Sequence, residues 1–208
     1  MPVVLIIDDH PIIRRGIRQI LEDKAGDIQV HEAGAVSDGL KKFREYDIDL
    51  VLLDISLPGR SGLDMLEDMK KLKSDAKILM ISMYPEEQYA IRALKSGASG
   101  YLTKESAPDE LLLAVDRIIN GGRYITQSLA EQIFDTLDKE GPVHRKLSNR
   151  EFEVMIQIAK GKDIKKIANA LSLSEKTVST YRSRILEKMN LLSNTDLVRY
   201  ALRNKLIE

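Results

Sequence analysis

The N-terminal part of the chain alternates short apolar runs with longer amphipathic segments. The apolar runs predict five β-strands, over 3–7, 28–32, 50–54, 77–82 and 100–102. Stretches of helical length separate and follow them, over 11–23, 37–46, 62–73, 86–96 and 106–119. Three of the runs are almost continuously apolar, as is typical of strands that are covered on both faces of a parallel sheet. Five strand–helix units in this order predict a doubly wound α/β domain.

The alternation stops at Gly121 and Gly122, and a different pattern follows. A short helix is expected over 128–138, before a polar stretch that contains Gly141 and Pro142 and ends at Lys146. We interpret residues 123–146 as a linker that contains one helix.

From residue 147 onward the apolar positions recur at helical spacing. Ser148 to Glu151 fit a capping box, and the helix that it starts should end near Gly161. Further helices are predicted over 163–171, 175–190 and 195–204, with a short turn at 172–174. Two helices around a short turn favour a helix-turn-helix. The pattern therefore predicts an α/β domain over 1–122 and an all-α domain of four helices over 147–208.

Composition favours a cytoplasmic protein. Of the 208 residues, 43% are hydrophobic and 31% are charged, which suits a soluble chain with a sizeable core. No apolar run approaches the roughly 18 residues that cross a bilayer, and no secretory signal is recognisable. The absence of cysteine excludes disulfides and thiolate metal sites, and the three scattered histidines (His10, His31 and His144) show no metal-ligand spacing.

The net charge of zero hides an asymmetry along the chain. Residues 1–122 hold 16 basic and 21 acidic side chains, a net charge of −5, and residues 123–146 hold four of each. Residues 147–208 hold 12 basic and 7 acidic side chains, a net charge of +5. This excess points the C-terminal region towards a polyanion, although chance also produces an excess of this size.

Polar residues fall where the predicted strands end. The first strand runs into Asp8 and Asp9, the third ends on Asp54, the fourth on Ser82, and Lys104 follows the fifth. Ligands of doubly wound sheets bind beyond the carboxyl ends of the strands. Taken singly, the acid pair fits a solvated turn, and Ser82 and Lys104 fit surface residues. Their order along four strands favours one shared site.

The chemistry of this set is that of phosphoryl transfer. Crowded carboxylates repel one another, and Mg²⁺ is the cation that such oxygen ligands suit. A cation there would offset the charge of an approaching phosphate, so that Asp54 could attack phosphorus and form an acyl phosphate. Ser82 would donate to one phosphoryl oxygen and Lys104 would neutralise another.

The segments VLIIDDHP, LVLLDISLPGRSGLD, ILMIS and GYLTK resemble the receiver domain of two-component response regulators, over about residues 1–122. The resemblance implies a five-stranded parallel sheet in the flavodoxin-like order 2-1-3-4-5. It implies that Asp54 is the phosphoacceptor. It also implies a Mg²⁺ site formed by Asp8, Asp9, Asp54 and the backbone carbonyl of Ser56.

The same resemblance assigns three further residues. Ser82 becomes the switch hydroxyl and Lys104 the phosphate-binding lysine. Tyr101 stands where receivers carry the aromatic side chain that reorients on activation, and its other interpretation is a half-buried strand tyrosine.

The helix predicted over 175–190 has a polar outer side with cations along its flanks. Val178, Ile185 and Met189 lie on its inner side. Glu187 lies on the outer side, and if the helix entered a DNA groove, this acid should stay near the exit because phosphates repel it. Such a helix suits the major groove of double-stranded DNA, although any solvated helix looks similar. The candidate DNA contacts are Lys176, Thr177, Ser179, Thr180, Tyr181, Arg182, Ser183, Arg184 and Lys188.

The segments LSNREFEVMIQIAKG, IKKIANALSLSEKTVSTYRSRILEKM and LVRYAL resemble the LuxR-type helix-turn-helix of the NarL/FixJ class, over about 147–208. Ser179 and Tyr181 depart from this pattern, because many members carry lysine and histidine there. Base readout is therefore expected to depend on Lys176, on water and on DNA shape.

The two resemblances imply a DNA-binding transcription regulator that is controlled by phosphorylation. A sensor histidine kinase would phosphorylate Asp54, and the surface around the fourth and fifth strands would repack. This change would release the C-terminal domain, favour a homodimer on DNA, or both. Four apolar residues of the last helix are a candidate dimer surface, with core packing expected for half of them: Leu197, Val198, Ala201 and Leu202.

Two alternatives stay open. A Mg²⁺-dependent phosphatase would use an aspartyl phosphate, but it usually needs a second acid beside the nucleophile, and Ile55 and Ser56 follow Asp54. A helix-turn-helix regulator could instead be controlled by protein contacts without phosphate. We expect no enzymatic turnover beyond slow phosphotransfer and self-dephosphorylation, and no membrane association.

Overall fold

The computed structural model describes residues 1–24, 28–135 and 142–207. The chain divides into two compact units, Met1–Glu131 and Gln132–Glu208. Among the described residues, no helix is long and apolar enough to cross a membrane.

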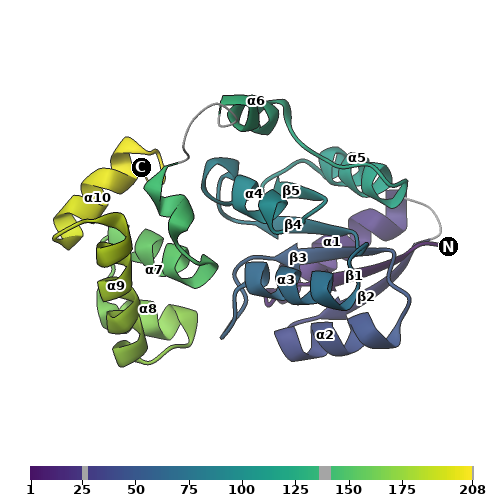
Figure 1. The fold of residues 1–208 in the computed structure, drawn as a ribbon. Helices are drawn as coiled ribbons and strands as arrows, with labels where there is room; N and C mark the ends of the chain where they lie inside the picture. The colour runs from purple at the N-terminus through teal and green to yellow at the C-terminus, as the bar shows by residue number, and fades with distance from the viewer. Residues whose placement is uncertain (25–27, 136–141, 208) are drawn as a thin grey trace. The chain divides into compact units, whose positions relative to one another are not determined.

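The first unit is built around a five-stranded parallel sheet in the order β2-β1-β3-β4-β5 (Figure 1). The strands are β1 (Val3–Ile7), β2 (Gln29–Ala33), β3 (Leu50–Asp54), β4 (Ile78–Ser82) and β5 (Gly100–Thr103). Each lies within one residue of the range that the apolar runs predict. The predicted strand order is confirmed.

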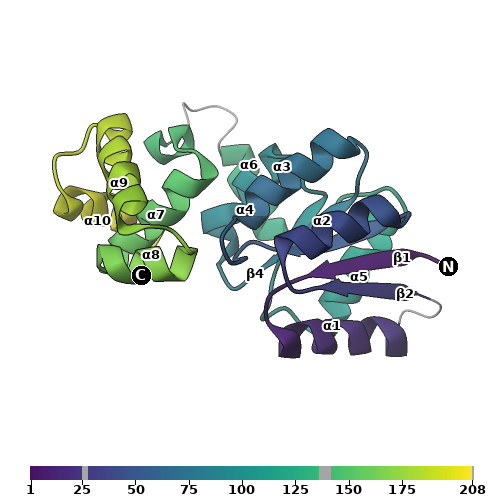
Figure 2. The same ribbon diagram turned by 90° about the horizontal axis from the view of Figure 1, so that it is seen from below.

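Helices cover both faces of this sheet. Figure 2 shows α1 and α5 on one face and α2, α3 and α4 on the other. All residues of β3 and β4 are buried, because strands in the middle of such a sheet have no solvated face. The helices are α1 (Pro11–Lys24), α2 (Val36–Glu45), α3 (Gly62–Leu72), α4 (Glu86–Lys95) and α5 (Pro108–Ile119).

The chain turns back after α5 and stays on the first unit. Gly121 takes the left-handed conformation with φ of 88°, which glycine adopts without strain. Tyr124 then forms a parallel bridge with Gly100, and α6 (Gln127–Asp135) begins shortly afterwards. This helix was expected over 128–138, and residues 136–138 of that range lie outside the described residues.

The second unit is helical. It contains a short 3-10 turn, η1 (Val143–Lys146), followed by α7 (Asn149–Ala159), α8 (Ile164–Leu171), α9 (Glu175–Met189) and α10 (Asn194–Arg203). The capping box at Ser148 and Glu151 is present, as predicted. The polar stretch that ends at Lys146 contains η1, a turn that the sequence pattern did not indicate. There, the hydroxyl of Tyr200 accepts a hydrogen bond from the backbone N–H of His144 at 3.2 Å and fixes the turn.

Candidate functional site

The carboxyl ends of β1, β3 and β5 bring three charged side chains together. The Nζ atom of Lys104 lies 2.6 Å from Oδ2 of Asp8 and 2.7 Å from Oδ2 of Asp54. All three side chains are at most 3% exposed. The parallel register, with Ile7 opposite Leu53, ends β1 and β3 at the same level and so places the two acids side by side.

One ammonium group between two buried carboxylates leaves a net negative charge. Burial raises the pKa of Asp54, and Lys104 offsets only part of this shift because it is shared with Asp8. Burial by itself would lower the pKa of Lys104, but the two carboxylates outweigh it and raise that pKa. Lys104 therefore stays protonated in this site. Its single positive charge does not balance the two carboxylates, so the site can also bind a cation.

The loop after Asp54 is held close to the strand. The backbone N–H of Ser56 donates to Oδ1 of Asp54 at 3.1 Å, and the N–H of Gly62 donates to the carbonyl of Ile55 at 2.8 Å. A Cβ atom on Gly62 would lie only 1.9 Å from the carbonyl oxygen of Asp54, so only glycine fits there. These contacts hold the side chain of Asp54 in place at the end of β3.

The acidic cluster fits a hard divalent cation. Asp8, Asp9, His10 and Asp54 offer ligand atoms within 4.8 Å of one another. The buried Oδ1 atom of Asp9 accepts no hydrogen bond among the described residues, although Nδ1 of His10 lies 2.9 Å from it, and a bound cation would satisfy this oxygen. Carboxylate oxygens in this number suit Mg²⁺ better than a soft metal.

His10 is part of this cluster, although the sequence indicated no ligand role for it. Its Nδ1 atom lies 3.0 Å from Oδ1 of Asp8 and 2.9 Å from Oδ1 of Asp9. Its backbone N–H donates to Oδ1 of Asp8 at 2.8 Å. Its position directly after the acid pair was the available signal, because a histidine next to two acids can join their site without a second histidine at ligand spacing.

Ser82 and Tyr101 meet at the loop between β4 and α4. The hydroxyl oxygen of Ser82 accepts from the N–H of Tyr84 at 3.1 Å, and the Tyr101 hydroxyl donates to the carbonyl of Tyr84 at 2.7 Å. Tyr101 is fully buried, and burial raises its pKa far above the ordinary range. The interpretation of Tyr101 as a half-buried strand residue was therefore wrong, because its ring belongs to the core.

In the second unit, α8, a short turn and α9 form the helix-turn-helix. Ser172 takes the left-handed conformation at the end of α8, and the Ser174 side chain caps α9 by accepting from the N–H of Thr177 at 3.0 Å. The predicted inner residues of α9 are buried, namely Val178, Ile185 and Met189. A surface hollow on the other side is lined by Lys176, Thr177, Thr180, Tyr181 and Arg184.

Other candidate DNA contacts on α9 have partners inside the unit. The Nζ atom of Lys188 lies 2.7 Å from Oε2 of Glu151, and the Nε of Arg182 donates to Oδ1 of Asn194 at 2.7 Å. The hydroxyls of Thr180 and Ser183 donate back to the carbonyls of Lys176 and Ser179 respectively. Lys188 and Arg182 thus fasten α9 to α7 and α10, whereas the hollow offers the more accessible cations.

On α10, the four candidate dimer residues divide as expected between core and surface. Leu197 and Ala201 are fully buried, whereas Leu202 is 49% exposed and Val198 is half-buried. The core packing that we expected for half of these residues is present.

Comparison with known proteins agrees with this architecture. Residues 4–116 match the family described as response regulator receiver domain, and residues 145–201 match the family of bacterial regulatory proteins, luxR family. The chain therefore belongs to the response regulators that join a receiver domain to a luxR-family DNA-binding domain, and it is a phosphorylation-dependent transcription regulator.

Particular relatives match the chain over its whole length. Response regulator UvrY of Escherichia coli strain K12 is 37% identical over 207 residues, which are 98% of this chain and 94% of UvrY. Response regulator GacA of Pseudomonas aeruginosa is 34% identical over 209 residues, with 99% and 97% of the two chains covered. The chain is also similar to a solved structure of RcsB from Salmonella enterica serovar Typhimurium, which is bound to promoter rprA in the presence of the phosphomimetic BeF3−. The TM-score is 0.66 at 25% identity, and the match covers 96% of this chain and 98% of RcsB.

Proposed function

We propose that Asp54 accepts a phosphoryl group from a sensor histidine kinase and that the resulting acyl phosphate controls DNA binding by α9. The observation that carries this proposal is the buried trio of Asp8, Asp54 and Lys104 at the carboxyl edge of the sheet. A buried carboxylate next to one shared ammonium is a nucleophile with a phosphate-binding cation already beside it.

We propose Mg²⁺ as the cofactor of this step. The carboxylates of Asp8, Asp9 and Asp54 and the backbone carbonyl of Ser56 would hold the ion, and the clustering of the acidic ligand atoms within 4.8 Å of one another supports this assignment. When bound, the ion supplies positive charge that offsets the repulsion between the Asp54 carboxylate and the phosphoryl oxygens. The bond between phosphorus and the kinase's histidine nitrogen breaks as an Asp54 oxygen bonds to phosphorus.

Three residues would then respond to the new dianion. Lys104 turns from the Asp54 carboxylate to a phosphoryl oxygen, and the Ser82 hydroxyl donates to another. Tyr101 follows Ser82, because both side chains hold the same residue, Tyr84. The loop between β4 and α4 is therefore the part of the receiver that senses the phosphate.

We propose that α9 enters the major groove with its N-terminal half. Lys176, Tyr181 and Arg184 line its outer hollow, and they would contact phosphates and base edges. The other candidate contacts are Thr177, Ser179, Thr180, Arg182, Ser183 and Lys188. Among these, Lys188 and Arg182 would first have to leave their partners Glu151 and Asn194.

We further propose the domain boundaries 1–122 for the receiver, 123–146 for the linker and 147–208 for the DNA-binding domain. The change of pattern at Gly121 and Gly122 and the capping box at Ser148 support them. The regulator would act in the cytoplasm as a homodimer on DNA, with Leu202 on the dimer surface. We propose no enzymatic turnover of a substrate, since the buried Ile55 and the exposed Ser56 after Asp54 offer no second acid.

Intact mass spectrometry tests the phosphoacceptor. The full chain is incubated with Mg²⁺ and acetyl phosphate, and wild type is compared with Asp54→Asn and with the exposed-site control Asp47→Asn. One phosphoryl adduct is expected on wild type and on the control, and none on Asp54→Asn. An equal adduct on Asp54→Asn would refute the assignment of Asp54.

A further inference from the structure

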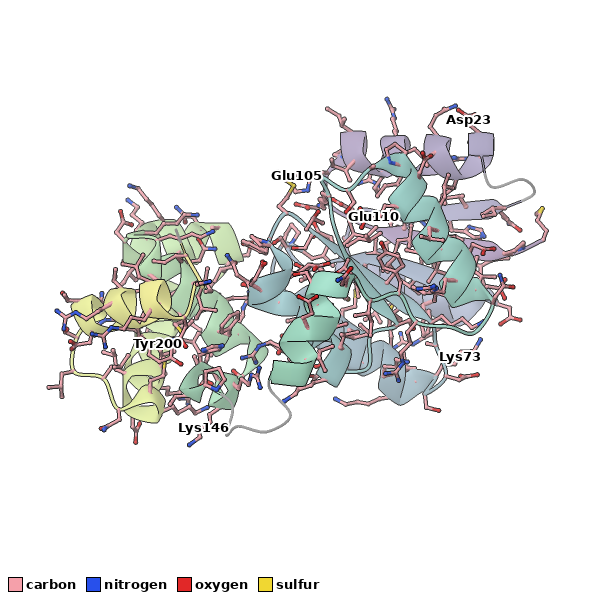
Figure 3. All side chains as sticks on the ribbon, turned by 90° about the horizontal axis from the view of Figure 1, so that it is seen from above. Asp23, Lys73, Glu105, Glu110, Lys146 and Tyr200 are labelled. Atoms are coloured by element: carbon pink, nitrogen blue, oxygen red, sulfur yellow. The ribbon has the colours of Figure 1, made fainter. Side chains whose placement is uncertain are left out.

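The segment after α5 is fixed along the edge strand of the receiver. The N–H of Tyr124 donates to the carbonyl of Ser99 at 2.9 Å, and the Tyr124 hydroxyl donates to Oε1 of Glu110 at 2.8 Å. Glu110, on α5, is labelled in Figure 3. A Cβ atom on Gly100 would lie 2.7 Å from the carbonyl oxygen of Tyr124, so glycine permits this close approach. The first part of the linker is therefore packed on β5.

Two residues further on, Thr126 caps α6 and contacts α4 at the same time. Its Oγ1 atom accepts a hydrogen bond from the N–H of Leu129 at 3.2 Å, which satisfies one of the free N–H groups at the start of the helix. The same hydroxyl donates to Oε2 of Glu86 at 2.7 Å. Glu86 is the first residue of α4. One hydroxyl thus joins the start of α6 to the start of α4.

The other end of this connection lies at Ser82 and Tyr101, the two proposed switch residues. Tyr84 stands two residues before Glu86, and its N–H and carbonyl are bonded to Ser82 and Tyr101 respectively. The ring of Tyr84 also stacks on that of Tyr89 in α4, with centroids 4.8 Å apart. The short chain segment from Tyr84 to Glu86 therefore connects the hydrogen bond at Ser82 with the hydrogen bond at Thr126.

We infer that the hydrogen bond between Glu86 and Thr126 is the device through which the state of Asp54 reaches the linker helix. This inference rests on the proposed function. When Ser82 turns to the phosphoryl group and Tyr101 follows, the hydrogen bonds from the Tyr84 N–H to Ser82 and from the Tyr101 hydroxyl to the Tyr84 carbonyl are lost. The segment from Tyr84 to Glu86 then shifts, and the Glu86 carboxylate releases Thr126. Glu86 and Thr126 are positioning residues in this device, since neither touches the phosphoryl group.

Hydrogen exchange in the unphosphorylated full chain tests the connection. The rate is measured by mass spectrometry on peptides that cover 124–135, for wild type, Glu86→Ala, Glu86→Gln and Glu87→Ala. Glu86→Ala should speed exchange in the first turn of α6 about fivefold, because a charge-assisted hydrogen bond is lost while the Thr126 cap stays. Glu86→Gln keeps an acceptor oxygen and should behave like wild type.

Glu87→Ala is the matched control, because it removes the same charge from the same turn of α4 at an exposed position. It should leave the exchange rate unchanged. An unchanged rate in Glu86→Ala, or an equal increase in Glu87→Ala, would overturn the inference.

A phosphorylated arm separates this inference from the proposed function. Wild type is treated with Mg²⁺ and acetyl phosphate, and the adduct is measured by intact mass on the same sample. The adduct should raise exchange in α6 to the rate of unphosphorylated Glu86→Ala, and it should add nothing further in that variant. An adduct without this increase would overturn the inference and leave the proposed function standing. The absence of any adduct on wild type would refute the proposed function, and the inference with it.

Discussion

Lys104→Met should be among the most destabilising single changes in the receiver domain. The ammonium of Lys104 is 2.6 Å and 2.7 Å from the Asp8 and Asp54 carboxylates, and the three side chains are almost fully buried. Removing one partner of a buried ion pair typically costs about 3–5 kcal/mol, because the remaining charge is left without compensation. Since domains of this size are stable by only about 5–15 kcal/mol, the loss is a large share of the total.

The assay is urea unfolding of the full chain in EDTA at pH 7.5, followed by circular dichroism, with Lys71→Met as the control. The Lys71 side chain is 74% exposed and its Nζ lies 3.6 Å from Oδ1 of Asp68, and such pairs contribute about 0–1 kcal/mol. Lower pH should restore part of the lost stability of Lys104→Met, because protonation of Asp54, whose pKa is raised by burial, removes one uncompensated charge. Added Mg²⁺ should restore part of it as well, by binding to the folded state. A loss below about 1 kcal/mol would refute the view that Lys104 neutralises a buried acid pair.

Three further results are expected. Burial raises the pKa of Asp54 above its ordinary value of 3.8. The contribution of this group to the free energy of unfolding therefore falls as pH rises from 3.8 to the pKa in the folded state. Urea midpoints measured across this pH range should change less with pH in Asp54→Asn than in wild type. Burial alone would raise the pKa of Glu151, but Lys188 and the Ser148 N–H outweigh it and lower that pKa. The ionised Glu151 therefore stabilises the folded state above its ordinary pKa of 4.5, and this stabilisation is lost as pH falls through the pKa in the folded state. Lys188→Met should therefore cost about 0.5–1 kcal/mol at pH 7 and less in acid, as thermal melts of the DNA-binding domain would show; an equal cost at both pH values would contradict this reasoning. Lys176→Ala should reduce the slope of log binding constant against log salt by about one, whereas Lys205→Ala should leave it unchanged, in anisotropy titrations with genomic DNA fragments.

Much of the fold follows from simple patterns in the sequence. Strands covered on both faces leave apolar runs such as Leu50–Asp54, so β3 could be located to the residue. The polar ends of these strands also indicated which side chains would meet, because parallel strands bring their carboxyl ends to one edge. The convergence of Asp8, Asp54 and Lys104 was therefore predictable without coordinates.

Other features depend on tertiary partners that a local pattern does not contain. The 3-10 turn at Val143–Lys146 is fixed by Tyr200, which stands 56 residues from His144. The start of the linker is held by contacts with Gly100 and Glu86, which the pattern over 123–146 does not contain, so the sequence indicated a linker with one helix but not its packing on the receiver. For the same reason the sequence could not show that Lys188 is paired with Glu151, whereas other cations of α9 are available to DNA.

The most direct test of the account is the DNA affinity of the full chain with and without phosphate on Asp54. Binding to genomic DNA fragments is titrated at one fixed salt concentration, for untreated protein and for protein treated with Mg²⁺ and acetyl phosphate, with adduct formation checked by intact mass. Phosphorylated wild type should bind DNA more tightly, and Asp54→Asn should show no change. Equal affinity of the phosphorylated and unphosphorylated wild type, with the adduct present, would contradict control of DNA binding by Asp54.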